Sequence, residues 1–570
     1  MPSIQARVSR GKKYWSIVES RRINGQPRTI ILEYLGTSES LLQRLQSESQ
    51  LSLKSYAHGD TRALLDVAAE LDIVNILNKH IPEGKRGNIQ TRNNLTVGLS
   101  LLLAAIGRAC HPTSKMGWYD WCKETSLEYC LRSSFKKLDS QHFWDQMEAF
   151  PVDAIAKIEE EIVLKLIEKY SIKPDCLFFD TTNFFTFIDS INQRCTIAQR
   201  GKNKQKRTDL RQIGMALLVT REEQLPLFHK TYQGNQHDST VFKEIFDSLH
   251  NRLKTITNEL ADITLVFDKG NNSKENFKKL DGEEGYYYVA GLVPSYFKEL
   301  IREANKNFSS LKIANETVPV YRVKQEVWKK IRTCVVTVSS QLKEGQLKGI
   351  EQHLVKKYKI LQKFKATLEN PKRRNHYSTE DIISRLQKTI RGQFIDEILK
   401  YDIFELNDKA FSFRYYLDDS AFEQLKNEIL GRQIVVTNRH EWSNEKILLT
   451  YRGQFNVENA FRNLKNPHHL AIRPQYHWTD QKIEVHFLIC IISYLLTVTT
   501  YSKVKKEVEY RGGINRLMED LKTIRLTCIA KKKSKKICYQ LEKIPLNLEK
   551  LCNVLNLTNK TIRPDQSAFQ

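Results

Sequence analysis

Tyr451-Arg-Gly-Gln-Phe-Asn-Val-Glu-Asn-Ala-Phe-Arg-Asn-Leu-Lys465 is the segment that constrains this chain most. Placed on one helix at roughly 100° per residue, five polar side chains fall within an arc of about 80°. They are Tyr451, Gln454, Glu458, Arg462 and Lys465. Val457, Ala460 and Leu464 point to the opposite side. Because a solvated helix face can show the same mixture, the segment needs support from elsewhere in the sequence.

Two acidic residues upstream each follow an apolar run, in Leu177-Phe-Phe-Asp180 and Thr264-Leu-Val-Phe-Asp268. We predict that each run is a strand ending at its aspartate, so that both carboxylates meet at one sheet edge. Glu458 on a neighbouring helix would complete the group. Hard divalent cations bind carboxylate oxygens, and a pair of ions about 3.5–4 Å apart assists phosphodiester chemistry. The alternative is that each aspartate forms a turn or caps a helix, as Asp180-Thr-Thr and Asp268-Lys-Gly allow.

The composition favours an ordinary globular protein that binds a polyanion. The 570 residues are enough for about two to four domains, and 41% are hydrophobic. Lysine and arginine exceed acidic residues by 90 − 66 = 24, which favours nucleic acid over an anionic membrane surface. The longest apolar run, residues 487–498, is shorter than the roughly 20 residues of a membrane span, so we predict a core helix there. With no signal-peptide pattern, we expect a cytoplasmic protein.

The ten cysteines are scattered and form no Cys-x-x-Cys pair. Cys110-His111 and the pair Cys122 and Cys130 come closest to a metal cluster, but their spacing is wrong for zinc. We therefore expect reduced, mostly buried thiols.

Hydrophobic periodicity predicts an α/β protein of six segments. Residues 1–50 form a small basic β module and 57–170 a helical domain. The segment 171–295 holds the first part of a mixed sheet, including Asp180 and Asp268. Residues 296–440 are an insertion that interrupts this sheet. The helix of Glu458 follows in 441–505, and 506–570 form a basic tail.

The spacing Tyr451-x2-Gln454-x3-Glu458-x6-Lys465 resembles the Tyr-Arg-Glu-Lys signature of one large group of bacterial insertion-sequence transposases. These are DDE enzymes with an RNase H-like catalytic domain. The resemblance covers roughly residues 90–500 in order, and it includes six further segments: 178–182, 207–219, 225–227, 234–238, 266–273 and 469–477. It implies an RNase H-like mixed five-stranded sheet with flanking helices and a large insertion. The 458 − 268 = 190 positions between the second aspartate and the glutamate match that insertion.

The resemblance also assigns roles to single residues. Asp180, Asp268 and Glu458 would be the catalytic triad and would bind two Mg²⁺ or Mn²⁺ ions. Tyr451 and Lys465 would contact DNA phosphates. The arginine of the signature is replaced by Gln454, a neutral donor that can still hydrogen-bond a phosphate. Of the two arginines that could compensate, Arg462 shares the polar face and Arg452 does not.

Other basic segments are candidate DNA contacts. The loop containing Lys202, Lys204, Lys206 and Arg207 is predicted to meet the DNA backbone, although it could be only a solvated turn. The basic rim of residues 1–50 and the lysine run 531–536 could likewise contact DNA or be only solvated. His237 and Asp238 either form a turn or belong to the shell of the site.

The mechanism implied is metal-dependent cleavage at the ends of an insertion sequence, followed by attack of the freed 3′-hydroxyl on target DNA. Related enzymes pass through a DNA hairpin, a step that this sequence does not reveal. The expected partners are double-stranded DNA, as terminal inverted repeats and as target, and a second copy of the chain in a homodimer at the nucleoid. Two alternatives stay open: an inactive DNA-binding relic, and a DNA endonuclease that performs no strand transfer.

Overall fold

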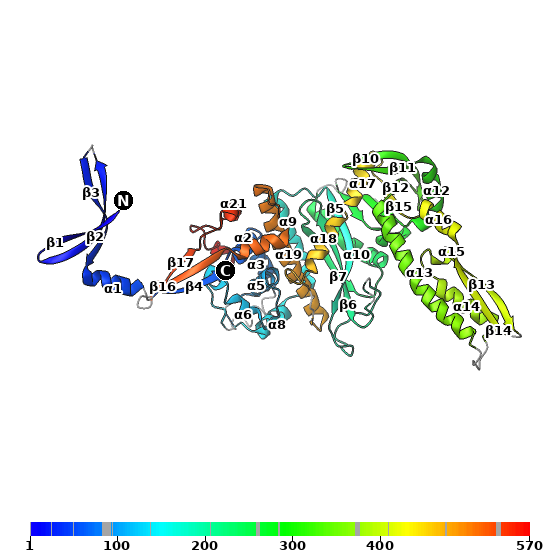
Figure 1. Ribbon diagram of the computed structural model, residues 1–570, viewed down its shortest axis with the longest axis horizontal. Coiled ribbons are helices and arrows are strands. Elements are labelled where there is room, and N and C mark those ends of the chain that lie inside the picture. Colours follow the sequence, from blue (N-terminus) through cyan, green and yellow to red (C-terminus); the bar gives the residue numbers. More distant parts are fainter. Residues whose placement is uncertain are drawn as a thin grey trace. The chain divides into compact units, whose positions relative to one another are not determined.

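The computed structural model describes most of the chain and separates it into two units (Figure 1). The first unit comprises Met1–Val152, Pro467–Ala471 and Leu488–Gln570, and the second Asp153–Asn466 and Ile472–Phe487. The described residues are 2–23, 26–48, 51–81, 93, 95–136, 138–203, 205, 207–257, 263–282, 286–370, 377–407, 410–472, 476–531 and 537–569.

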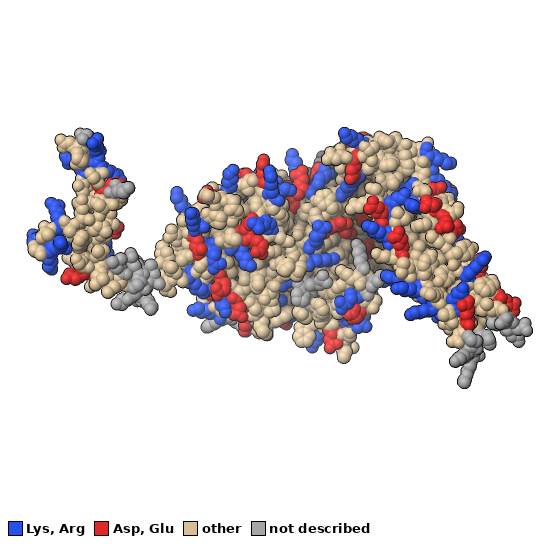
Figure 2. Space-filling model, viewed as in Figure 1, with Lys and Arg blue, Asp and Glu red and all other residues tan. Residues whose placement is uncertain are grey.

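The first unit begins with a three-stranded antiparallel sheet of β1 (Ser3–Ser9), β2 (Lys12–Ile23) and β3 (Gln26–Thr37). This is the meander that the alternating pattern predicts. Its exposed side chains include many lysines and arginines, and blue side chains gather on this sheet in Figure 2. Helices follow, with α2 (Gly59–Glu70), α3 (Ile73–Lys79) and the buried α5 (Val97–Cys110) in contact with one another.

The C-terminal segment is folded, so the prediction of a basic tail over 506–570 is wrong. Strand β16 (Arg525–Lys531) pairs with β17 (Ile537–Leu541) and with β4 (Leu51–Ala57). Its alternating pattern places Leu526 in the core, fully buried. The lysine run suggested a tail because it comes at the end of β16; residues 532–536 lie outside the described part of the chain.

A mixed nine-stranded sheet forms the second unit, in the order β10-β11-β12-β15-β9-β8-β5-β6-β7. The last five strands in this order are β9 (Tyr287–Leu292), β8 (Thr264–Phe267), β5 (Cys176–Thr186), β6 (Arg211–Thr220) and β7 (Pro226–Gln233). The pairs β5–β8 and β8–β9 are parallel, whereas β5–β6 and β6–β7 are antiparallel.

The predicted sheet of five strands is too small, because the segment 296–440 extends it. The added strands are β10 (Ser309–Ile313), β11 (Glu316–Val327), β12 (Lys330–Val338) and β15 (Arg432–Thr437). Strand β15 pairs with β9 on one side and with β12 on the other. The segment that was expected to interrupt the sheet therefore also builds nearly half of it.

Helices cover both faces of the sheet next to β5 (Figure 1). On one face, the ring of Phe242 in α10 (Asp238–Ile256) lies 5.3 Å from that of Phe179 and 5.4 Å from that of Phe267. On the other face α18 (Phe455–Leu464) contacts β5 and β6 through its buried apolar side. Successive side chains of a strand point to opposite faces, so Phe178 and Asp180 lie on the face that α18 covers.

The rest of the segment 296–440 is a lobe with its own hydrophobic core. It comprises α13 (Ser340–Leu368), α14 (Thr379–Ile390), α15 (Ile395–Ile398), β13 (Leu399–Asn407), β14 (Ala410–Leu417) and α16 (Asp419–Glu428). Side chains such as Leu361, Ile382 and Phe413 are fully buried within it. The lobe leaves the sheet after β12 and returns to it at β15.

Helix α19 (Asp480–Val508) contains the longest apolar run of the sequence. Its 29 residues are long and apolar enough to cross a membrane, but 94% of the apolar window is buried inside the protein. Such burial is typical of a core helix, in agreement with the prediction for residues 487–498.

Candidate active site

The pairing of β5 with β8 places Asp180 and Asp268 side by side. The two strands are parallel, with Phe178 opposite Val266 and Phe179 opposite Phe267, and the next position on each strand is the aspartate. Neighbouring strands lie about 4.8 Å apart. Asp268 follows the end of β8 as predicted, but Asp180 lies within β5, which continues to Thr186. The prediction that Asp180 ends its strand is wrong, because β5 extends into a long hairpin with β6.

Residues 451–465, which the periodicity places on one helix, belong to two helices. Helix α17 (Asn444–Arg452) ends just before Gly453, and α18 begins at Phe455. A Cβ atom on Gly453 would lie 2.6 Å from the ring of Phe178, so the chain can approach β5 this closely only with glycine. A glycine within a helical pattern was the available signal for this break.

Tyr451, at the end of α17, holds Asp268. Its hydroxyl donates a hydrogen bond to the Asp268 carboxylate at 3.1 Å. The phenol lies directly over Gly291 of β9, where a Cβ atom would come within 2.2 Å of the tyrosine oxygen. Sequence reasoning missed Gly291, although glycine inside a strand often marks a close approach of this kind. The chain therefore fixes the position of one carboxylate through a buried phenol.

Glu458, the third predicted carboxylate, lies in the first turn of α18, the helix that packs on β5. Burial raises the pKa of Tyr451 well above its usual value, and the negative charges of Asp268, Asp180 and Glu458 raise it further. All three carboxylates thus raise the pKa of the same phenol. Near neutral pH the phenol stays protonated and acts as a hydrogen-bond donor to Asp268. The side chain of Glu458 is exposed.

Gln454 points into the protein. Its amide nitrogen donates to the backbone carbonyl of Phe179, next to Asp180, at 3.1 Å. Its buried amide oxygen has no hydrogen-bond partner among the described residues. From the sequence, Gln454 is expected to contact a DNA phosphate. The observed geometry suits a different role, in which Gln454 positions β5.

Two basic residues at the C-terminal end of α18, Arg462 in its last turn and Lys465 just after it, differ in exposure. Lys465 is half-buried; its ammonium donates to the Thr182 hydroxyl at 2.5 Å and lies 5.1 Å from the centre of the Phe184 ring. Arg462 is exposed on the same helix. Arg452 is turned away and forms an ion pair with Glu316 at 3.5 Å. Arg462 is thus free of the ion pair that holds Arg452, and its contact with a DNA phosphate stays a prediction.

Gln454→Met is expected to leave the salt dependence of DNA binding unchanged, because the side chain is turned inward. Arg462→Gln is expected to lower the slope of log K against log salt by about one, the effect of losing one phosphate contact. Fluorescence titrations of both variants at several salt concentrations measure this. A loss of slope in Gln454→Met equal to that in Arg462→Gln would contradict the inward role.

Asp238 adds a fourth carboxylate near the pair of aspartates. It accepts a hydrogen bond from Thr181 at 2.7 Å, and Thr181 follows Asp180 in β5. Burial raises the pKa of the neighbouring Tyr232, and Asp238 and Asp180 raise it further. The sequence left Asp238 open between a turn and the shell of the site. The structure places it at the N-terminus of α10, beside β5.

The basic loop after residue 200 does not contact the three carboxylates in the described residues. Lys202 and Arg207 are exposed, and Arg207 pairs with Asp209 at 2.6 Å, which offsets its charge. Lys204 and Lys206 lie outside the described residues. The predicted DNA contact of this loop stays a prediction.

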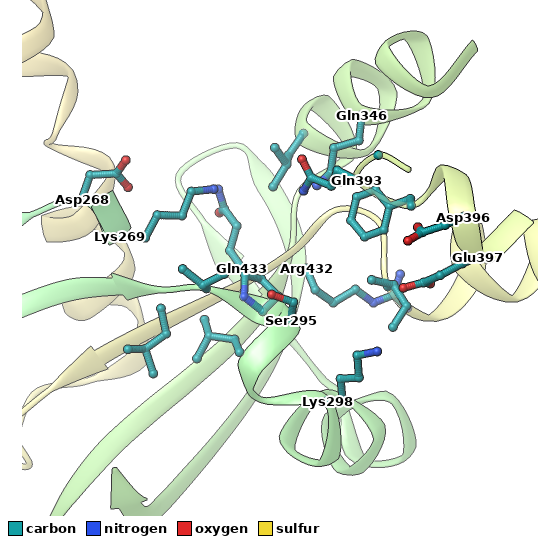
Figure 3. Close-up of a pocket in the computed structure, with 18 of the residues that line it drawn as sticks. Asp268, Lys269, Ser295, Lys298, Gln346, Gln393, Asp396, Glu397, Arg432 and Gln433 are labelled. Carbon is teal, nitrogen blue, oxygen red and sulfur yellow. The ribbon is translucent and has the colours of Figure 1, made fainter. Parts of the chain in front are cut away.

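A cavity of about 630 Å³ opens beside Asp268 and Tyr451 and extends toward the helical lobe. Figure 3 shows Asp268 and Lys269 at one end and Gln393, Asp396 and Glu397 of the lobe at the other. Lys298 and Arg432 also line it. The candidate site is thus continuous with a space bounded by both the sheet and the lobe.

The donor set agrees in kind with a hard divalent cation, which takes carboxylate oxygens. Within the described residues, no three His, Cys, Asp or Glu side chains are close enough to hold a metal ion as they stand. Asp180 and Asp268 follow paired positions on adjacent strands. Rotation of the two side chains is therefore enough to bring their carboxylates together.

Residues 185–496, more than half of the chain, match the family described as Transposase DDE domain. The chain therefore belongs to this family and is a DDE transposase. None of the curated proteins searched matches it. Among solved structures, it is similar to a cryo-EM structure of the piggyBac transposase synaptic complex with hairpin DNA. The identity is 10% and the TM-score 0.37, over 81% of this chain and 79% of that chain.

Proposed function

We propose that this protein is the transposase of an insertion sequence, which cuts DNA at the ends of its element and joins them to target DNA. The supporting observation is the placement of Asp180 and Asp268 directly after paired positions of two adjacent parallel strands, with Tyr451 bonded to Asp268 and α18, which carries Glu458, packed on the same strand β5. The three carboxylates come from two adjacent strands and one helix, and they lie within the family match or, for Asp180, five positions before it (185 − 180).

We assign the binding of divalent metal, Mg²⁺ or Mn²⁺, to these three carboxylates. Such ions stabilise charge on the attacking and leaving oxygens of a phosphodiester. Tyr451 keeps its proton and holds the Asp268 carboxylate in place. Gln454 holds the backbone of β5 at Phe179, and with it the position of Asp180.

The order and directions of β7, β6, β5, β8 and β9 support an RNase H-like assignment for this half of the sheet. DNA would follow α18, with Arg462 and Lys465 on its phosphates. The N-terminal sheet carries exposed Arg7, Lys12 and Arg28, a charge pattern suited to further backbone contacts. Two copies of the chain would hold the two element ends, in the cytoplasm at the nucleoid.

Wild-type protein with Mg²⁺ is expected to nick DNA that carries the inverted repeats flanking its own coding sequence. EDTA, or the substitution Asp180→Asn, should abolish nicking without loss of binding. Gel analysis of end-labelled DNA, followed by a strand-transfer assay with a target plasmid, measures both steps. Nicking without joining would indicate an endonuclease, and binding without nicking a relic. No binding at all would contradict the proposal.

A further inference from the structure

Three exposed aromatic side chains lie at the far end of β5, on the loop after this strand and on the segment 476–478 that is hydrogen-bonded to that loop. Phe187, Tyr476 and Trp478 are 50%, 63% and 64% exposed. The rings of Phe187 and Tyr476 lie 5.6 Å apart at an angle of 33°. Large aromatic rings gain much from burial, and a cluster this exposed marks a surface that binds something. We call these three residues the aromatic platform.

The segment that carries two of the rings is firmly anchored. His477, between Tyr476 and Trp478, is only 4% exposed and stacks on His486 of α19 at 4.3 Å. Asp480 accepts hydrogen bonds from the Thr196 and Ile197 amides at 2.8 and 3.0 Å. Alternation of buried and exposed positions therefore directs both aromatic rings outward.

The loop that carries Phe187 is anchored as well. The Asn192 amide donates to the Trp478 carbonyl at 3.0 Å, which joins the loop to the second segment. Arg211 donates to the Ser190 and Asn192 carbonyls, and Arg200 to the Ser190 hydroxyl at 2.8 Å. The platform is thus built on a hydrogen-bonded support.

The charge around the platform is positive. Arg194 and Arg200 are exposed beside it, and Arg211 is half-buried below the loop. Two acidic residues lie on the same segments: Asp189 accepts from the Ile191 amide, and Asp480 accepts from backbone amides and the Thr196 hydroxyl. Two copies of the chain that met through this face would bring like charges together. A polyanion with flat apolar groups fits the surface better, and nucleic acid with unpaired bases has both properties.

The platform lies in line with the candidate active site. Strand β5 leads from Asp180 past Thr182, which Lys465 contacts, to Thr186, and Phe187 follows. Seven residues of extended chain span about 23 Å, the length of about seven nucleotides at the roughly 3.4 Å rise of a base-stacked strand. A strand held at Asp180 therefore reaches the platform without a change of direction.

We propose that Phe187, Tyr476 and Trp478 stack on unpaired bases of the DNA strand held in the active site, about seven nucleotides from the scissile phosphate. This inference rests on the proposed function, because that function puts DNA at Asp180. Strand separation near an element end exposes the bases that the platform takes. The positive loop holds the backbone of the same strand.

Binding of the full-length chain to blunt duplex DNA and to the same duplex with single-stranded extensions of either polarity tests the proposal. Wild type should prefer extended DNA of one polarity by at least about tenfold, since stacking contributes roughly 5- to 150-fold per base. Tyr476→Ala with Trp478→Ala should remove this preference and leave blunt-duplex binding within about twofold. Trp478→Phe should retain most of it. Tyr416→Ala, which removes another aromatic that is 45% exposed, is the matched control.

A fluorescent adenine analogue placed at successive positions of the extension should be quenched most about seven nucleotides from the cleavage site. Equal preference in wild type and the double variant, with cleavage intact, would overturn the platform and leave the proposed function standing. Loss of self-association in the double variant, with DNA binding unchanged, would assign the surface to a second copy and also overturn it. Absence of DNA binding in wild type would contradict the proposed function itself.

Discussion

Glu458→Gln is expected to lower the rate of DNA cleavage at least about a thousandfold while DNA binding stays within about twofold. The substitution keeps the size of the side chain and removes the charge that would bind metal. A metal ion contributes several kcal/mol to stabilising the transition state, and each 1.36 kcal/mol corresponds to a tenfold change in rate. Single-turnover cleavage with Mg²⁺, beside an electrophoretic binding assay, measures the two quantities separately.

Glu445→Gln is the matched control, because Glu445 is an exposed acid in the first turn of α17 and takes no part in the site. It should cleave at the wild-type rate. Equal loss of binding and cleavage in Glu458→Gln would show that the residue is structural. Near-normal cleavage would remove Glu458 from the triad.

Gly291→Ala is expected to lower the cleavage rate by about a hundredfold. The new Cβ atom would lie 2.2 Å from the Tyr451 oxygen and 2.9 Å from the ring carbon that bears it, so the phenol must move away from Asp268. A displacement of about 1 Å in an active site can cost a hundredfold in rate. Overpacking should also lower the free energy of unfolding by about 1–3 kcal/mol. Cleavage kinetics and urea denaturation check the two effects.

Gly345→Ala gives the comparison, since a Cβ atom there meets nothing within 4 Å and the residue lies in α13. It should stabilise the protein by about 0.5–1 kcal/mol without changing cleavage. In a Tyr451→Phe background, Gly291→Ala should cost less than in wild type, because the nearest clashing atom is gone. Additive losses in this double-mutant cycle would disprove the contact.

The apolar runs before Asp180 and Asp268 were a direct sign of buried strands, and both strands are present as β5 and β8. It placed Asp180 at the wrong point of its strand. The run of β5 continues past the aspartate as Thr-Thr-Asn-Phe-Phe-Thr, and whether such residues pair further depends on the partner β6. Long-range pairing of this kind is not encoded in local periodicity.

The inward position of Gln454 could not be predicted from the sequence either. One helix through residues 451–465 satisfies the apolar pattern, and only the close approach of Gly453 to Phe178 breaks it. The extension of the sheet by four strands was missed for a related reason. Strands β11 and β12 carry apolar runs, but β15, the strand that pairs with β12, comes about a hundred residues later in the chain.

The attachment of the helical lobe bears on how this enzyme can be modified. Val338 at the end of β12 pairs with Arg432 at the start of β15, and the Ser339 amide donates to the Gly431 carbonyl at 2.8 Å. The strands that flank the lobe are thus an ordinary β-hairpin whose turn has been replaced by the lobe. With both connections a few ångströms apart and a core of its own, the lobe is an exchangeable module. A relative could gain, lose or swap it without disturbing the register of the sheet.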